Sequence, residues 1–500
     1  MKKLIILLIF FTPLCRINAQ TTFNIDTIEY ARAKAYKKDF KEADRLLTIY
    51  SKEHKNVNAM RLHAQVLYWM KAFNRSETVY KNLLKAFPNE QVVKLDYGRM
   101  LYEMNKLQRA ELLLNGYVMT NPQSPEANIL LAYINYWKGH FQPAREKVAV
   151  VLAAFPDNKA ALAFLKDIQI VTAPYLKLGA DFASDDQPLK KTSYNIEAGW
   201  YKSWLFSPVV QANTYHFNTN DSTYNTVWAR LGNKISFGNT GFSLSFKAGV
   251  FDHPAAAKAI FTGGGSVTQK ITKLLSLYAS TEKIPYQYTS ASASIPVTQQ
   301  FTGFGINFNK SDKCLGMAAY ELQHYDDTNK IQTMYVWALI PIIHKQHFKL
   351  KAGYAFSHAN ADNNTFTSSQ PLNTLISTTA PGSIVAGYYN PYFTPNNQTL
   401  NSILALVEIH LSKKVSFSLD GKVGVLTSSN NPELVFTRNS GNMFGIDKSY
   451  YKQSYTPIEF QSAINIKLSD RLTFISKYEY KKLLFYSINQ GTISIKYAFS

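Results

Sequence analysis

The residues whose types and spacing could support chemistry are few, and they are scattered along the 500-residue sequence. His344 and His347 stand three positions apart, but no third metal ligand lies near them. A zinc site needs three or four ligands, so this pair alone does not predict one. The pairs Asp185-Asp186 and Asp326-Asp327 could act in acid–base chemistry or bind calcium, but both are typical of solvated turns. We therefore expect no metal site and no catalytic site.

Other motifs that carry chemistry are missing from the sequence. The run Gly263-Gly264-Gly265 lacks the strand-to-helix context of a phosphate-binding loop. Two cysteines cannot build a disulfide framework, and Cys314 is interpreted as a small apolar strand residue. Neither Gly-x-Ser-x-Gly nor His-Glu-x-x-His occurs. The sequence thus predicts a protein that is not an enzyme and holds no cofactor.

The excess of basic residues, 54 Lys and Arg against 34 Asp and Glu, suggests an anionic partner such as nucleic acid. The N-terminus argues against nucleic acid. Basic Lys2 and Lys3, the apolar run Leu4–Leu14 and small Ala19 together predict a secretory signal peptide over residues 1–19. Lipoprotein processing at Cys15 is the alternative, although the residues before it match that signal poorly. Because secretion separates the chain from cytoplasmic nucleic acid, we expect no nucleic-acid partner.

A period of 33 or 34 residues organises the first third of the chain. One set of small residues recurs at this spacing and predicts the close approach of paired helices: Ala43, Ser76, Ala110 and Ala144. Prolines, which end helices, follow twelve residues after the last three of them: Pro88, Pro122 and Pro156. An ordinary helical bundle has no reason to keep such a period.

These positions resemble those of the tetratricopeptide repeat family, with four units over residues 24–157. Lys55 replaces the proline in the first unit, which is typical of a terminal repeat. Residues 158–171 are predicted to form a capping helix and a linker. The resemblance implies an α-solenoid that binds a protein partner and has no chemistry of its own.

From residue 172 onward, the apolar residues alternate with polar ones. Ile493, Ile495, Tyr497 and Phe499, for example, lie on one face of the last segment. Strands of about 10 residues with one apolar face are typical of an outer-membrane β-barrel, and a soluble β-sandwich is the alternative. The sequence therefore predicts an α + β multidomain chain, an N-terminal solenoid followed by a transmembrane antiparallel β-barrel over residues 172–500.

The strand count and the loop lengths refine this prediction. Seventeen candidate strands lie between Ala173 and Ser500, and the pattern is doubtful over Lys258–Lys273. Because single-chain bacterial barrels have an even number of strands, we expect sixteen rather than eighteen. With a periplasmic C-terminus, the long connections over residues 359–397 and 427–455 both fall on the outer side.

Alternation also assigns a set of lysines to the barrel lumen, with Asp420 and Glu479 as the few acids facing inward. A basic lumen would favour an anionic cargo, although these lysines could instead pair with loop carboxylates or lie at the membrane rims. The lumen lysines assigned in this way are Lys247, Lys349, Lys351, Lys422, Lys477 and Lys496.

The layout of a periplasmic tetratricopeptide solenoid before a large barrel is similar to that of bacterial exopolysaccharide secretion porins, which export cellulose or poly-N-acetylglucosamine. Gly387-Tyr388-Tyr389-Asn390-Pro391 resembles a Tyr-Tyr-Ser-Pro stretch of the cellulose subunit, with Asn390 in place of Ser. The resemblance implies that an anionic or neutral polysaccharide passes through a barrel embedded in outer-membrane lipid. Two alternatives stay open: a barrel that only anchors periplasmic protein assembly, and a barrel enzyme acting on lipid or glycan.

Overall fold

The computed structural model describes residues 25–187, 189–219, 222–237, 240–272, 274–310, 314–441, 443–484 and 486–499. The signal peptide predicted over residues 1–19 lies outside this part of the chain. Two compact units make up the chain, one ending at Ile134 and the other beginning at Asn135.

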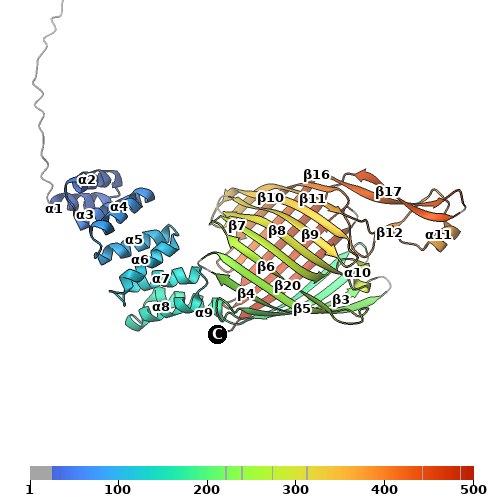
Figure 1. Ribbon diagram of the computed structural model, residues 1–500, viewed down its shortest axis with the longest axis horizontal. Coiled ribbons are helices and arrows are strands. Elements are labelled where there is room, and N and C mark those ends of the chain that lie inside the picture. Colours follow the sequence, from blue (N-terminus) through green and yellow to red (C-terminus); the bar gives the residue numbers. More distant parts are fainter. Residues whose placement is uncertain are drawn as a thin grey trace, which may run out of the picture. The chain divides into compact units, whose positions relative to one another are not determined.

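Paired antiparallel helices form the N-terminal third of the described chain (Figure 1). Small residues at the predicted repeat positions are fully buried, which lets neighbouring helices approach closely; they include Ala43, Ser76, Ala110 and Ala144. Pro88, Pro122 and Pro156 lie in the turns after the second helix of a pair. The helices are α1 (Ile25–Tyr36), α2 (Phe40–Glu53), α3 (Val57–Trp69), α4 (Phe73–Ala86), α5 (Gln91–Glu103), α6 (Leu107–Val118), α7 (Pro125–Trp137), α8 (Phe141–Ala154) and α9 (Lys159–Thr172).

The turn inside each helix pair contains a residue in the left-handed conformation. Lys38, Lys71, Asn105 and Gly139 have φ values of 62°, 61°, 57° and 77°. They follow the same 33- or 34-residue spacing as the buried small residues. Asparagine and glycine adopt this conformation readily, whereas the two lysines do so at some cost in backbone strain. Within the described residues, the helices are all too short or too polar to cross a membrane.

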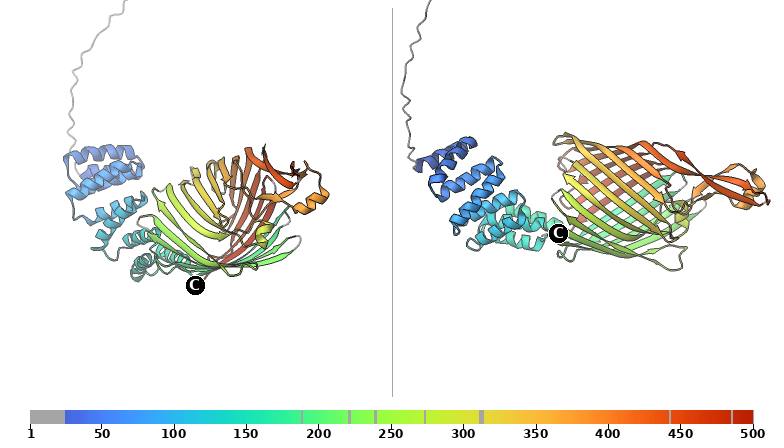
Figure 2. Two further views of the ribbon diagram at one scale, coloured as in Figure 1. Left: turned by 45° about the vertical axis from the view of Figure 1, so that its right-hand side comes forward. Right: turned by 45° about the horizontal axis from the view of Figure 1, so that its top comes forward.

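Sixteen antiparallel strands close into a barrel, as the sequence predicts (Figure 2). Each strand pairs with its neighbours along the chain, and Tyr175 of the first strand lies opposite Ala498 of the last. The strands are β1 (Tyr175–Asp185), β2 (Lys190–Gly199), β3 (Pro208–Asn218), β4 (Thr223–Phe237), β5 (Phe242–Asp252), β6 (Ile260–Lys270), β7 (Leu275–Pro285), β8 (Thr298–Lys310), β9 (Cys314–Tyr325), β10 (Lys330–His344), β11 (Phe348–Ala361), β15 (Gln398–His410), β16 (Val415–Arg438), β18 (Ile458–Lys467), β19 (Leu472–Lys482) and β20 (Ser487–Ala498).

Most of the doubtful segment over Lys258–Lys273 lies in strand β6, whereas Lys273 falls outside the described residues. The glycine run of β6 fits between two neighbouring strands, because a Cβ on Gly264 would lie 2.0 Å from the carbonyl oxygen of Thr281. Two further strands of the same sheet, β13 (Ile384–Val385) and β17 (Phe444–Gln453), pair with the second half of β16. The first half of β16 pairs with β15 and β18. The region that the sequence leaves in doubt therefore contributes one of the sixteen strands of the ring, whereas β13 and β17 pair outside it.

The two ends of the barrel differ strongly. The base, where Tyr175 and Ala498 lie, carries short connections such as Ser412-Lys413 and Ser469-Asp470. The mouth, at the opposite end, carries both long connections, over residues 362–397 and 439–457, and the second half of β16 extends beyond the ring there. These connections contain β12 (Phe366–Ser368), α11 (Leu372–Thr378), β13, β14 (Gly387–Tyr389) and β17, and another loop at the mouth contains α10 (Ser290–Ser294).

Candidate functional site

The inner face of the barrel is defined by strand alternation and register. Large apolar side chains such as Leu178, Leu231 and Ile495 are 45–57% exposed and share one face of the sheet. Opposite residues of paired antiparallel strands lie on the same face, so the register can be followed around the whole ring. In a closed barrel with an exposed apolar outer face, the alternate residues face the lumen.

The register places the predicted lysines on this alternate face. Lys496 lies opposite both Lys177 and Thr473. Lys477 lies opposite Thr492 and Ala463, and Lys247 opposite Gly232. The remaining members of the set follow the same alternation on neighbouring strands: Lys349, Lys351 and Lys422.

The same register brings more acids to this face than the sequence predicts. Asp420 and Glu479 lie there as expected. They are not the only acids on this face, however, so the prediction of few inward acids is wrong. Six further carboxylates share this face. They are Asp181, Glu197, Glu282, Glu321, Glu408 and Glu459.

Several inner-face cations pair with these strand carboxylates. Lys351 Nζ is 2.9 Å from Glu408 Oε2, and its residue is only 5% exposed. Lys422 Nζ is 2.8 Å from Glu459 Oε1. For these two lysines, the partners lie on adjacent strands and not in loops. Because the charges compensate locally, the inner wall is polar without being uniformly basic.

One loop folds inward at the mouth. Residues 286–297, which join β7 to β8 and contain α10, reach inner-face residues of strands three to five positions away around the ring. Gln287 Nε2 donates to Thr226 Oγ1 at 2.7 Å, and Ala293 packs against Phe217 and Leu189. His253 Nε2 lies 3.1 Å from the carbonyl oxygen of Ala293. We call this segment the mouth loop; it occupies part of the lumen entrance.

The long β11–β15 connection holds the mouth loop from the other side. Thr289 Oγ1 donates to the carbonyl oxygen of Pro391. Tyr392 stacks on Tyr325 with ring centroids 3.6 Å apart, and its hydroxyl donates to Asp327 at 2.5 Å. Burial raises the pKa of the Tyr392 hydroxyl, as does this hydrogen bond. The Gly387–Pro391 stretch that resembles the cellulose subunit thus belongs to the structure around the mouth.

At the base, the α7–α8 turn and α9 contact the barrel. The Tyr201 hydroxyl, from the β2–β3 connection, donates to the carbonyl oxygen of Gly139 at 2.7 Å, and its ring packs edge-on against Phe141. Lys166 pairs with Asp470 in the β18–β19 turn, and the hydrogen bond from Lys166 lowers the pKa of that carboxyl. These contacts hold the last helix pair against the barrel base.

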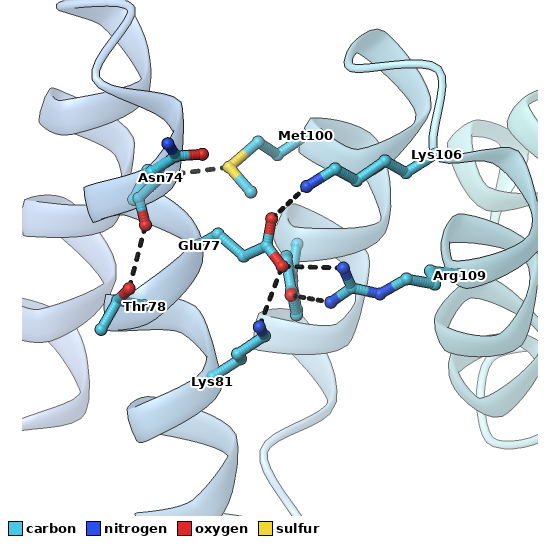
Figure 3. Close-up of polar contacts among 9 residues, drawn as sticks. Asn74, Glu77, Thr78, Lys81, Met100, Lys106 and Arg109 are labelled. Carbon is cyan, nitrogen blue, oxygen red and sulfur yellow. Dashed lines mark hydrogen bonds and ion pairs between the residues drawn. The ribbon is translucent and has the colours of Figure 1, made fainter. Parts of the chain in front are cut away.

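The helical repeats contain a second polar cluster, around Glu77 of α4 (Figure 3). Arg109 Nη1 is 2.7 Å and Lys81 Nζ is 3.0 Å from Glu77 Oε1, while Lys106 pairs with Oε2. Burial alone would raise the pKa of Glu77, but the hydrogen bonds from the three cations lower it to about 2. Arg109 also donates to the Tyr97 hydroxyl, and burial raises the pKa of Tyr97 to about 12. The cluster ties α4 to α6, which makes it a stabilising contact between repeats.

Comparison with known proteins supports the assignment of tetratricopeptide repeats to the N-terminal helices. Residues 70–134 match the family model "Tetratricopeptide repeat". No curated protein matches the chain. Solved structures that resemble parts of it include MamA from Desulfovibrio magneticus RS-1, with 17% identity, 29% of this chain and 83% of that chain covered, and a TM-score of 0.28.

Two further similarities cover different parts of the chain. A tetratricopeptide repeat protein from Parabacteroides merdae is 15% identical over 29% of this chain and 59% of that one, with a TM-score of 0.27. A bacterial polysaccharide outer membrane secretin is 7% identical over 66% of this chain and 100% of that one, with a TM-score of 0.47. By sequence and fold together, the chain joins tetratricopeptide repeats to a closed barrel of sixteen antiparallel strands.

Proposed function

We propose that the chain is an outer-membrane barrel that conducts a polysaccharide outward, with its repeats acting as a periplasmic scaffold. The observation that carries the proposal is the closed ring of sixteen strands with an apolar outer face and a polar inner face. The chain itself would catalyse no reaction. Its partners would be outer-membrane lipid, a periplasmic protein and the polymer.

The hydrogen bonding of the sheet supports the proposed insertion into a membrane. In lipid, each unpaired backbone N–H or C=O costs several kcal/mol, so a spanning sheet must close on itself. The β1–β20 pairing closes this one. The strands are long enough, because β1 has 11 residues and β2 has 10, and a tilted strand spans the bilayer with about 9–11. An exposed apolar outer face in water would favour aggregation, whereas in lipid it is solvated.

Polymer conduction is supported by the width and the chemistry of the barrel. Barrels of about sixteen strands can enclose an aqueous channel. The inner face carries hydroxyl, amide and paired charged groups, which hydrate a moving polymer without holding it through a single strong charge. The layout resembles that of exopolysaccharide secretion porins, and this resemblance is the reason for naming a polysaccharide as the cargo.

The scaffold role rests on an exposed aromatic surface in the first repeats. Tyr36 is 79% exposed and Trp69 is 44% exposed. Together with Phe40, Arg32 and other residues, they line a pocket of about 320 Å³. Exposed aromatic residues beside an arginine are typical of protein-binding surfaces. A periplasmic protein is therefore the expected partner of the repeats.

A second candidate function is favoured by the mouth loop. Because this loop occupies part of the lumen entrance, the barrel could serve only as an anchor that holds the repeats at the membrane. The two functions differ in what happens to the polymer when the protein is missing.

Deletion of the gene, followed by measurement of surface and periplasmic polysaccharide, distinguishes these functions. Export predicts that surface polysaccharide falls and that polymer accumulates in the periplasm. Complementation with the barrel carrying an unrelated helical domain in place of residues 25–134 then tests the scaffold separately. Unchanged surface polysaccharide in the deletion strain would rule out export and leave the anchor.

A further inference from the structure

A cavity of about 460 Å³ lies in the barrel wall, and its residues from β15 and β18 come from the mouth-side halves of those strands. This volume is typical of small-ligand pockets, which range from about 300 to 1,000 Å³. Its lining comes from six strands, β10, β11, β15, β16, β18 and β19. On the inner face, the small Ala355 and Ser357 of β11 lie opposite the larger Trp337 and Tyr335 of β10, which leaves room beside the two rings.

Ser402 of β15 belongs to the cavity lining and has an unsatisfied hydroxyl. The residue is 0% exposed, and its Oγ has no hydrogen-bond partner among the described residues. Its neighbours on the adjacent strands, Ala355 and Gly424, offer no polar side-chain atom. A buried hydroxyl without a partner costs about 1–3 kcal/mol, so a ligand atom that pairs with it would be bound favourably.

The remaining groups of the lining suit a sugar ring. Trp337 and Tyr335 offer aromatic surface on which the C–H face of a pyranose can pack. Asp420, Gln461 and Glu479 supply acceptors for sugar hydroxyls from the neighbouring strands. Aromatic surface and hydrogen-bond acceptors thus lie in one cavity of the inner wall.

The charges in the cavity select against an anionic sugar. Asp420, Glu459 and Glu479 line it together with a single cation, Lys422. Lys422 pairs with Glu459 at 2.8 Å and Lys481 pairs with Glu479 at 2.7 Å, which leaves Asp420 as the lining carboxylate without an ion pair to a described residue. Another carboxylate brought into this cavity would be repelled, while a hydroxyl or an ammonium group would not.

We propose that this cavity is a binding subsite for a pyranose unit that carries no negative charge, as found in a neutral or an amino-bearing polysaccharide. The proposal rests on the proposed transport of polysaccharide and narrows its cargo class. It also reverses the preference for an anionic cargo that the lysines alone suggest. The unit would stack on Trp337 and pair with Ser402 and Asp420.

Calorimetric titration of the purified full-length protein in detergent tests the subsite with three probes. Cellohexaose is uncharged, the glucosamine hexamer is cationic, and the galacturonate hexamer is anionic. We expect the galacturonate hexamer to bind at least about tenfold more weakly than cellohexaose. Comparison of the first two probes tells a neutral cargo from an amino-bearing one.

Two variants locate the binding. Trp337→Ala should weaken cellohexaose binding about tenfold, and Ser402→Ala should weaken it a few-fold. Ser280→Ala is the matched control, because Ser280 shares the inner face on β7 but lies outside the cavity lining. Its affinity for cellohexaose should equal that of the wild type.

The subsite proposal is overturned if neither cellohexaose nor the glucosamine hexamer binds. It is also overturned if the galacturonate hexamer binds as tightly as the better of them, or if both cavity variants keep wild-type affinity. Ion conductance of the same protein in a planar bilayer reports separately on the proposed function. If the barrel conducts ions but binds no sugar, only the subsite proposal is ruled out. If it binds sugar but never conducts, only the transport proposal is ruled out.

Discussion

Glu77 is the residue on which the contact between α4 and α6 depends. Its side chain is 9% exposed and meets three cations from α4, the α5–α6 turn and α6. The pKa of this carboxyl is about 2 in the folded protein, below its ordinary value of 4.5. A lowered folded-state pKa means that ionisation stabilises the fold above about pH 4.5, and that this contribution is lost as the pH falls towards 2.

Glu77→Gln should therefore lower the free energy of unfolding of the repeats by about 1–2 kcal/mol at neutral pH, after allowance for the solvent-exposed cations. The difference from the wild type should shrink as the pH falls towards 2. Urea denaturation followed by helical circular dichroism measures both quantities. Glu103→Gln, at an exposed position of α5, is the control and should have little effect. A pH-independent difference would show that the carboxylate charge is not what stabilises this contact.

Gly98 is required by the close packing of α5 and α6. A Cβ at this position would lie 2.8 Å from Cγ of Leu114, which is fully buried. Gly116 is also helical, but a Cβ there would lie 3.9 Å from Lys94 Cδ, an ordinary contact. Both replacements by alanine gain helix propensity, and only one creates a clash.

Gly98→Ala should destabilise the repeats by about 1–2 kcal/mol, because overpacking outweighs the propensity gain. Gly116→Ala should instead stabilise them by about 0.5–1 kcal/mol. The midpoints of urea denaturation compare the two variants directly. Shifts of the same sign and size would contradict the packing role of Gly98.

At the scale of elements, the mouth loop offers the most direct test of the proposed transport, because it lies at the lumen entrance. Its contacts to Thr226, Phe217 and Pro391 are made by a few side chains and can be removed without touching the strands. Replacing residues 286–297 with a short Gly-Ser linker should raise the ion conductance of the barrel in planar bilayers, by at least about twofold. The matched control is Ile295→Ser, which changes a 47% exposed side chain of the same loop. Equal conductance in all three proteins would mean that the loop does not limit the lumen.

The repeats and the barrel strands could be predicted because both follow from the spacing of apolar and small residues over short stretches of the sequence. The spacing of Ala43, Ser76 and Ala110 predicts paired helices. The alternation of apolar and polar residues over 493–499 predicts a strand with one apolar face. The left-handed Lys38 and Lys71 carry the same period, but lysine gives no signal for that conformation. Local patterns therefore identify elements better than they identify turns.

The inner-face acids and the mouth loop were missed for a different reason. The face of a strand residue depends on register, and irregularities at Pro341/Ile343 and Asn401/Ser402 shift it within this barrel. Glu408 lies on β15, which carries the second of these shifts, whereas Glu459 lies on β18, where only the pairing with Lys422 of β16 shows its face. The mouth loop packs on residues that lie tens of positions away in the sequence, so the local residue pattern does not predict this packing. Both features are products of tertiary pairing.

At the scale of the whole molecule, one chain combines tetratricopeptide repeats and a closed barrel. The apolar outer face, the polar inner wall and the repeats are each explained by polymer export across the outer membrane. A pure anchor explains the outer face and the repeats, but it does not require a polar cavity with an unsatisfied Ser402 hydroxyl in the inner wall. The two accounts therefore differ in whether sugar crosses the barrel.

Release of labelled cellohexaose from liposomes containing the full-length protein tests this central claim most directly. The account predicts release above that from protein-free liposomes, and faster release when residues 286–297 are replaced by the short linker. It also predicts slower release of the labelled galacturonate hexamer than of cellohexaose. Retention of both sugars by liposomes carrying either form of the protein would contradict the account and leave the barrel as an anchor.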